Sequence, residues 1–266
     1  MGVKTMIKRS YGLGALAATG LLVFGLAAPM TAQAGVCTFG AGGGASLQGI
    51  LDGITTNPLG ASSTNVTTDC LDDGGDSVWS SGGAGGSVAT IIAEMAGFAG
   101  DNIFGIWDAA NPGTKVTVFA GADGPGDATT ISVLANGSIL LNFVDTGIDF
   151  AGNAFGFFLD SSANAGGGVF YSDTTLNTDG ADHMYAYEGG NGDTIQIPPF
   201  AAGGWLSNEY ILAFEDLDFV IGSDGDYTDF VVIVESISPV PEPATLALTG
   251  LGLFGLGFAS RRRKQS

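Results

Sequence analysis

The chain has 266 residues, 45 of which are glycine, and 8 Lys and Arg stand against 27 Asp and Glu, for a formal net charge of −19. Such an acidic chain is repelled by nucleic acid and by anionic lipid, which excludes nucleic-acid binding as its function. It contains a single histidine, His183, so zinc sites built on two or three imidazoles are also excluded.

The first 34 residues have the order of parts of a secretory signal peptide. Basic residues within the first nine positions precede an apolar stretch over residues 13–28, and Ala32 and Ala34 are small residues that signal peptidase accepts. We predict cleavage before Gly35 and export of the remaining chain.

Export changes the electrostatic character of the chain. Residues 35–242 keep one basic residue, Lys115, and all 27 acidic residues, so their formal charge is −26. Divalent cations, or a polysaccharide bridged by cations, are the natural partners of such a surface. The alternative is that the acidity only keeps an exported protein soluble.

Residues 35–100 are expected to form a glycine-rich, loop-rich region closed by a disulfide. Cys37 and Cys70 are the only cysteines, and an oxidising compartment favours their pairing. The bond closes a loop of about thirty residues and stabilises the fold by about 3 kcal/mol in the chain-entropy model. Apolar residues at helical spacing predict a short helix near Ser87–Phe98, capped by Ser87.

Residues 101–238 show short β-rich runs separated by Gly, Asp and Asn, the pattern of an all-β sandwich of the jelly-roll kind. An Asn136-Gly137 turn predicts a type I′ hairpin. The nine predicted strands cover residues 115–120, 131–135, 138–143, 155–159, 169–171, 184–187, 194–197, 209–214 and 230–235.

The densest group of carboxylates lies between the last two predicted strands. Its members are Glu215, Asp216, Asp218, Asp224, Asp226 and Asp229. Hard oxygen ligands in a flexible loop are what calcium selects, although the spacing differs from an EF-hand. The sequence therefore predicts calcium as a cofactor here; the alternative is that these residues only form surface turns.

The same segment resembles a family of uncharacterised domains that occur beside bacterial sorting signals and in calcium-rich adhesins. The resemblance rests on Leu212-Ala213-Phe214-Glu215-Asp216-Leu217 and Asp224-Gly225-Asp226-Tyr227-Thr228-Asp229, and it extends over about residues 153–235. It implies a β-sandwich with a metal-stabilised terminal hairpin and no established reaction. Thr228 stands where the family more often has asparagine.

The sequence gives little support for an enzymatic function. His183 is expected to begin a strand at the domain surface rather than to serve a catalytic triad. With 27 acidic residues, some carboxylate pair will always suit glycoside hydrolysis, so such a pair carries no weight. The three tryptophans and several tyrosines either stack on sugars or, as we expect, fill the core.

At the C-terminus, Pro241-Glu242-Pro243 is expected to form an extended hinge, residues 244–260 a single short transmembrane helix, and Arg261, Arg262 and Arg263 to hold the tail inside. This order of parts resembles the PEP-CTERM sorting signal of Gram-negative surface proteins. The resemblance covers residues 240–265, within a segment that we bound at 239–266. It implies recognition and cleavage by an exosortase.

We therefore predict a non-enzymatic protein of the cell surface or the exopolysaccharide matrix, with a calcium-stabilised loop. Its processing partners are signal peptidase and an exosortase, and it is held transiently in the inner membrane before it reaches the outer surface. Two other functions remain open: a calcium-dependent carbohydrate-binding module, with extracellular polysaccharide as its partner, and a secreted hydrolase that uses a carboxylate pair.

Overall fold

A computed structural model describes residues 36–81, 87–93 and 100–240. The predicted signal peptide, the Pro-Glu-Pro hinge, the transmembrane helix and the arginine tail lie outside these residues. Within the described part of the chain, no helix is both long and apolar enough to cross a membrane.

Two large antiparallel sheets confirm the predicted all-β class. In spatial order, one sheet contains β11 (Met184–Glu188), β14 (Glu209–Phe214), β15 (Phe230–Glu235), β3 (Ser87–Ala93), β6 (Ala128–Val133), β7 (Ser138–Leu141) and β8 (Val144–Asp149). The other contains β16 (Ile237–Pro239), β2 (Trp79–Ser81), β9 (Ala154–Asp160), β4 (Ile103–Asp108) and β5 (Asn111–Phe119), with β10 (Val169–Tyr171) also paired to β9.

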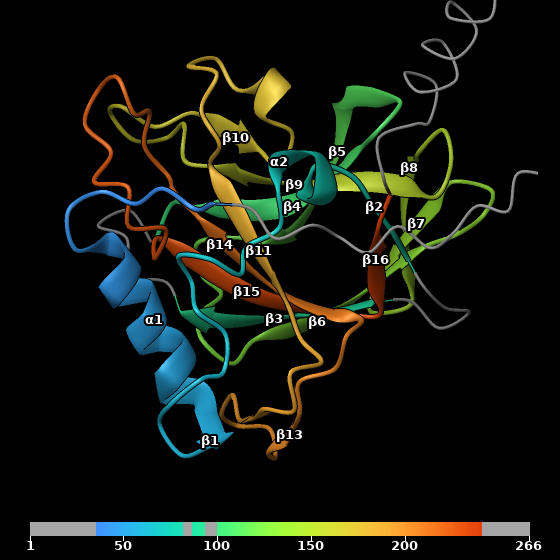
Figure 1. Ribbon diagram of the computed structural model, residues 1–266. Helices are drawn as coiled ribbons and strands as arrows, with labels where there is room; N and C mark the ends of the chain where they lie inside the picture. Colours follow the sequence, from blue (N-terminus) through green and yellow to red (C-terminus); the bar gives the residue numbers. More distant parts are fainter. Residues whose placement is uncertain (1–35, 82–86, 94–99, 241–266) are drawn as a thin grey trace, which may run out of the picture. The chain divides into compact units, whose positions relative to one another are not determined.

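A small third sheet and three short helical segments complete the described structure (Figure 1). The sheet is formed by β1 (Thr55–Asn57), β12 (Thr194–Ile195) and β13 (Gly203–Gly204). The helical segments are α1 (Gly43–Ile54), α2 (Asp73–Asp76) and the 3-10 turn η1 (Thr174–Leu176).

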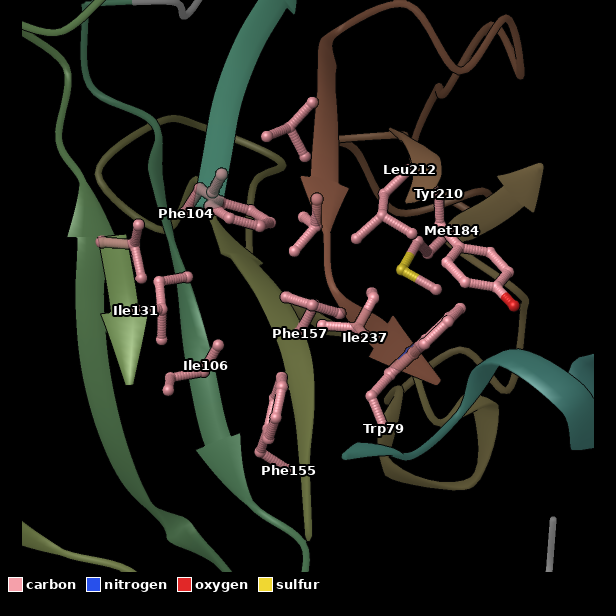
Figure 2. Packing of buried hydrophobic residues seen from close by; sticks show 14 of the residues in the cluster. Trp79, Phe104, Ile106, Ile131, Phe155, Phe157, Met184, Tyr210, Leu212 and Ile237 are labelled. Atoms are coloured by element: carbon pink, nitrogen blue, oxygen red, sulfur yellow. The ribbon is translucent and has the colours of Figure 1, made fainter. Parts of the chain in front are cut away.

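The main core lies between the two large sheets. Phe104 on β4 and Phe157 on β9 face Leu212 and Phe214 on β14, and all four side chains are fully buried. Figure 2 shows this layer from close by, with Trp79 and Met184 at one side. The Phe104 ring stacks with that of Phe157, their centroids 5.7 Å apart. Burial of these large apolar side chains is the main source of stability.

A second core covers the opposite face of the seven-stranded sheet. Ile211 on β14 and Ile233 on β15 pack there with Leu47 and Leu51 of α1. Because adjacent strand residues point to opposite faces, a strand that is covered on both faces needs apolar residues at every position. This explains the unbroken apolar runs of β14 and β15.

The expectation of a helix near Ser87–Phe98 is wrong for residues 87–93, which form β3 between β15 and β6. Residues 94–99 lie outside the described structure. The residues of β3 are rich in β-branched side chains, which suit a strand that pairs on both edges. The region predicted to be loop-rich also supplies α1 and β2.

All nine predicted strands are present, within a few residues of the expected bounds. The predicted type I′ turn at Asn136-Gly137 is wrong, because only Gly137 has a positive φ, of 94°. Leu134 and Ser138 instead close a three-residue loop. The next hairpin carries positive φ at both Asn142 and Phe143, as a type I′ turn requires.

The predicted disulfide between Cys37 and Cys70 is present. Both cysteines are buried in the second core beside Tyr187. Cys70 also forms an isolated bridge with Tyr187 of β11. The bond therefore holds the segment before α1 against the edge of the seven-stranded sheet.

Candidate metal centre

The predicted acidic loop is held between the ends of two paired strands. Glu215 follows β14 directly, and Asp229 directly precedes β15. Phe214 and Phe230 are partners in the antiparallel register, so the two carboxylate residues just beyond them are neighbours. The pairing of β14 with β15 thus brings together two residues that are fourteen positions apart.

Five of the six predicted ligands form two carboxylate triads that share Glu215. One oxygen each of Glu215, Asp216 and Asp229 lies within 4.8 Å of the others, and the same holds for Glu215, Asp224 and Asp226. Asp218 belongs to neither triad. Its Oδ1 accepts a hydrogen bond from the Val220 N–H, 2.7 Å away, and so closes a turn.

Backbone hydrogen bonds orient these carboxylates. Glu215 Oε2 accepts from the Asp226 N–H at 3.1 Å, and Asp229 Oδ2 accepts from the Asp216 N–H at 3.0 Å. Asp226 Oδ1 accepts from both the N–H and the hydroxyl of Thr228, at 2.8 and 2.7 Å. Thr228 therefore holds Asp226 in place, which gives a role to the residue that departs from the family pattern.

Burial disfavours the charged form of the carboxyl groups at this site. Glu215 and Asp216 are only 1% and 2% exposed. Burial raises the pKa of Glu215 to about 7; burial, together with repulsion from Glu215 and Asp216, raises the pKa of Asp229 to about 9. The one Lys or Arg in the described residues, Lys115, lies over the Phe158 and Tyr171 rings instead.

Asn102, just before β4, supplies an unpaired oxygen beside the first triad. Its side chain is 2% exposed, and its Nδ2 donates to Asp216 Oδ2 at 3.0 Å. Its Oδ1 is buried and has no hydrogen-bond partner. Side-chain amide oxygens are calcium ligands, and buried polar atoms are rarely left unpaired. The residue set therefore fits a calcium ion. Sequence reasoning missed Asn102, which lies 114 positions from Asp216.

The glycine run, residues 40–44, in which only Ala41 is not glycine, packs directly on the acidic loop, residues 215–229. The Gly40 N–H donates to the Gly225 carbonyl at 2.8 Å. A Cβ atom at Gly40 would lie 1.7 Å from the Asp224 carbonyl oxygen, and one at Gly43 would lie 2.7 Å from Asp226 Cα. A side chain at Gly40 or Gly43 would therefore clash with the backbone of the acidic loop.

Tyr227, within the acidic loop, has an unusual backbone conformation. Its φ is +55°, a left-handed value that is uncommon for an aromatic residue. Its ring stacks on Tyr185 at 4.1 Å and meets the edge of Phe39 at 5.5 Å. Its hydroxyl donates to the Asp182 carbonyl at 2.7 Å. These contacts hold Tyr227 in its left-handed conformation.

His183 is fully buried, so the expectation that it begins a strand at the surface is wrong. Its Nε2 lies 2.9 Å from Asp179 Oδ2, and its Nδ1 lies 3.1 Å from the Glu215 carbonyl oxygen. The two contacts fix the orientation of the imidazole ring. The ring also stacks on Phe170 at 3.8 Å. His183 thus positions the Glu215 backbone.

The aromatic residues fill the interior, as the sequence predicts. Trp79, Trp107 and Trp205 are at most 2% exposed, and Tyr185, Tyr187 and Tyr210 are also buried.

A separate groove of about 350 Å³ is lined by Ile195, Phe200 and the cross-strand pair Glu209 and Glu235. Burial raises the pKa of both these carboxyl groups. Phe200, 46% exposed, is the aromatic ring of this groove.

Comparison with known families assigns two segments of the chain. The domain of unknown function DUF4114 matches residues 150–236, and the PEP-CTERM protein-sorting motif matches residues 239–264. No curated protein and no solved structure shows significant similarity to the chain. The predicted sorting signal and the resemblance to an uncharacterised domain family are both confirmed.

The chain therefore carries a DUF4114 domain followed by a PEP-CTERM motif. The motif marks it as an exported protein that is anchored transiently in a membrane, processed by an exosortase and displayed at the surface. The acidic loop, residues 215–229, lies wholly within the DUF4114 match, whereas Asn102 and the glycine run lie outside it.

Proposed function

We propose that this is a non-enzymatic protein of the cell surface or exopolysaccharide matrix whose acidic loop binds calcium. The observation that carries the proposal is the buried triad of Glu215, Asp216 and Asp229, with the unpaired Oδ1 of Asn102 beside it. Glu215 and Asp216 are buried and Asp229 is half-buried, and the one Lys or Arg of the described residues, Lys115, lies over the Phe158 and Tyr171 rings instead.

The ligand set is composed of hard oxygen atoms from three carboxylates and one amide, with Asp224 and Asp226 nearer to solvent. Calcium tolerates such flexible, oxygen-rich sites, whereas magnesium demands stricter octahedral geometry. A bound calcium ion supplies the positive charge that lets these carboxylates ionise together. In its absence, burial raises the pKa of both Glu215 and Asp229, so both groups bind protons more tightly than free carboxyl groups do.

Calcium bound here would connect three parts of the chain. The loop joins β14 to β15, Asn102 precedes β4 in the opposite sheet, and Gly40 anchors the segment next to the disulfide. The exported chain has a formal charge of −26, so each ion also lowers its internal repulsion. We expect the folded domain to be stable where calcium is abundant.

The test is a thermal melt of the exported protein in chelator and then in millimolar calcium. At a hundredfold excess over Kd, calcium adds about 2.7 kcal/mol to stability. For a domain of this size that corresponds to a rise of about 5–10 °C in Tm. Asp226→Asn/Asp229→Asn keeps the size of both side chains, and it should lose most of the rise.

Asp149→Asn is the matched control, because Asp149 is exposed on β8 and belongs to neither triad. It removes one charge from the surface and should respond to calcium as the wild-type protein does. Identical melts of the wild-type protein in chelator and in calcium would refute the proposal.

Surface delivery is tested by replacing Pro241, Glu242 and Pro243 with alanine. We expect the uncleaved precursor to accumulate in the membrane fraction, since the hinge is the processing site. Normal release of the variant would contradict our assignment of the hinge.

Binding to polysaccharide is a separate question for the same protein. Trp205 is buried, so its replacement would disturb the fold rather than a sugar-stacking surface. Phe200→Ala is the suitable variant, because this ring is exposed beside the Glu209 and Glu235 groove. Glycan binding that disappears with chelator and with Phe200→Ala would assign the carbohydrate-binding alternative.

A further inference from the structure

The groove of about 350 Å³ lies between the seven-stranded sheet and the small third sheet. Residues of β15, β3 and β6 line one side, among them Ile233 and Glu235 of β15. The other side is lined by Ile195 of β12, by Phe200 and by β13, which consists of two exposed glycines. The groove is therefore open to solvent and has mostly apolar walls.

Two glutamates, Glu209 on β14 and Glu235 on β15, are the charged residues of this groove. They are partners in the antiparallel register, so their side chains leave the same face of the sheet with Cβ atoms about 4.5–5.5 Å apart. Like charges directly opposite each other destabilise a pair of strands. The Leu206 N–H donates to Glu209 Oε2 at 2.8 Å and so holds this carboxylate in place.

Both glutamates are half-buried, and burial raises the pKa of both carboxyl groups. Repulsion from Glu235 further raises the pKa of Glu209. A positive charge between the two carboxylates would remove this repulsion. The pair therefore has the charge of a cation-binding site.

The exported chain supplies no basic side chain to this pair. Lys115, the one Lys or Arg between residues 36 and 240, lies 4.7 Å from the centroid of the Tyr171 ring. His183, the one histidine, is fully buried beside Asp179. A second copy of these residues has the same two basic groups, so the cation must come from another molecule.

An organic cation suits the pair better than a metal ion. Among the described residues, the carboxylates close enough to share a metal ion in threes are those of the acidic loop. Calcium takes six to eight oxygen ligands, whereas an ammonium group needs few acceptors and carries a stem that apolar walls can cover.

We propose that the groove binds a primary ammonium group on an aliphatic chain, as in a free polyamine or a lysine side chain. The ammonium donates to Glu209 and Glu235, and the methylene groups pack on Ile195 and Ile233. Phe200, 46% exposed, adds an aromatic face for the cation. No residue of the groove belongs to a triad of the acidic loop, so this site is independent of calcium there.

The test is isothermal titration calorimetry of the exported protein, in chelator and again in calcium. Cadaverine represents a free polyamine, and Nα-acetyl-lysine amide represents a lysine side chain of a protein. We expect binding in both solutions, and the ligand that binds more tightly identifies the source. The Nε-acetylated derivative of the same lysine amide keeps the stem without the charge, and it should not bind.

Glu209→Gln/Glu235→Gln removes both charges and keeps an oxygen for the Leu206 N–H. We expect it to bind the amine at least about tenfold more weakly, because charge-assisted hydrogen bonds are lost. Phe200→Ala should weaken binding about two- to fivefold. Asp145→Asn/Asp149→Asn is the matched control, because it removes two exposed charges from β8 of the same sheet. It should bind as the wild-type protein does.

Thermal melts provide the second measurement. Without ligand, the double glutamine variant should be at least as stable as the wild-type protein, because the cross-strand repulsion is gone. The amine should raise the Tm of the wild-type protein but not that of this variant. Glu235→Gln alone is a milder variant and should weaken binding severalfold. If neither amine binds at millimolar concentration, or if the glutamine variants bind as well as the Asp145→Asn/Asp149→Asn control, then our inference is overturned.

Discussion

The contact between the glycine run and the acidic loop gives the sharpest prediction of the structure. Gly40 has no positive φ, so Gly40→Ala adds a methyl group without straining the backbone. The new Cβ would lie 1.7 Å from the Asp224 carbonyl oxygen and 2.8 Å from its carbon. Both atoms belong to the backbone, so no flexible side chain can move aside.

The size of the effect follows from two contributions. Overpacking at a well-packed contact costs about 1–3 kcal/mol, and loss of the 2.8 Å hydrogen bond from Gly40 to Gly225 costs about 1 kcal/mol. We therefore expect Gly40→Ala to lower the free energy of unfolding by about 2–4 kcal/mol. A domain of this size loses about 2–4 °C in Tm for each kcal/mol.

Urea denaturation of the exported protein, followed by fluorescence of its buried tryptophans, measures this change. Gly49→Ala is the matched control, because Gly49 is exposed within α1 and a Cβ there meets nothing within 4 Å. Alanine should stabilise the helix by about 0.5–1 kcal/mol. Equal effects of the two substitutions would refute the packing of the glycine run on the loop.

Three further predictions concern the whole domain. In chelator, the free energy of unfolding should fall as pH rises from about 5 to 9, because the raised pKa values of Glu215 and Asp229 let the folded state bind protons that the unfolded state releases. Saturating calcium should flatten this pH dependence, and thermal melts across the pH range check both expectations. Replacing Cys37 and Cys70 with serine should lower the free energy of unfolding, measured in urea, by about 3–4 kcal/mol. An unchanged midpoint of the urea transition would show that the disulfide constrains the unfolded chain little. Trp205→Ala should cost about 3–5 kcal/mol, because the ring is buried and its Nε1 donates to the Glu209 carbonyl; a stable variant that only loses glycan binding would contradict this.

Much of the candidate site could be predicted because it is local in sequence. Glu215 and Asp229 flank two strands with strong apolar runs, and adjacent antiparallel strands bring their ends together. The disulfide and the sorting motif could also be predicted from the sequence, since each depends on a few residue types in a short or unique pattern. Five of the six predicted ligands therefore lie in the two triads.

The contacts that complete the site could not be predicted, because their partners are far apart in the chain. Asn102 lies 114 positions from Asp216, and Gly40 contacts a loop some 185 residues later. His183 likewise looked like a surface residue, because the Glu215 carbonyl and the Phe170 ring cover it only in the folded chain. A lone Asn, Gly or His has no local signal of such a role.

Pairing with neighbouring strands decided the secondary structure where the local sequence pattern favoured a helix. Residues 87–93 place apolar side chains at helical spacing, yet they form β3 because β15 and β6 offer free edges on both sides. Local sequence determined the targeting ends, the disulfide, most strands and the acidic loop. Tertiary structure alone decided which charges are buried, because burial depends on what the sheets and α1 bring over each carboxylate.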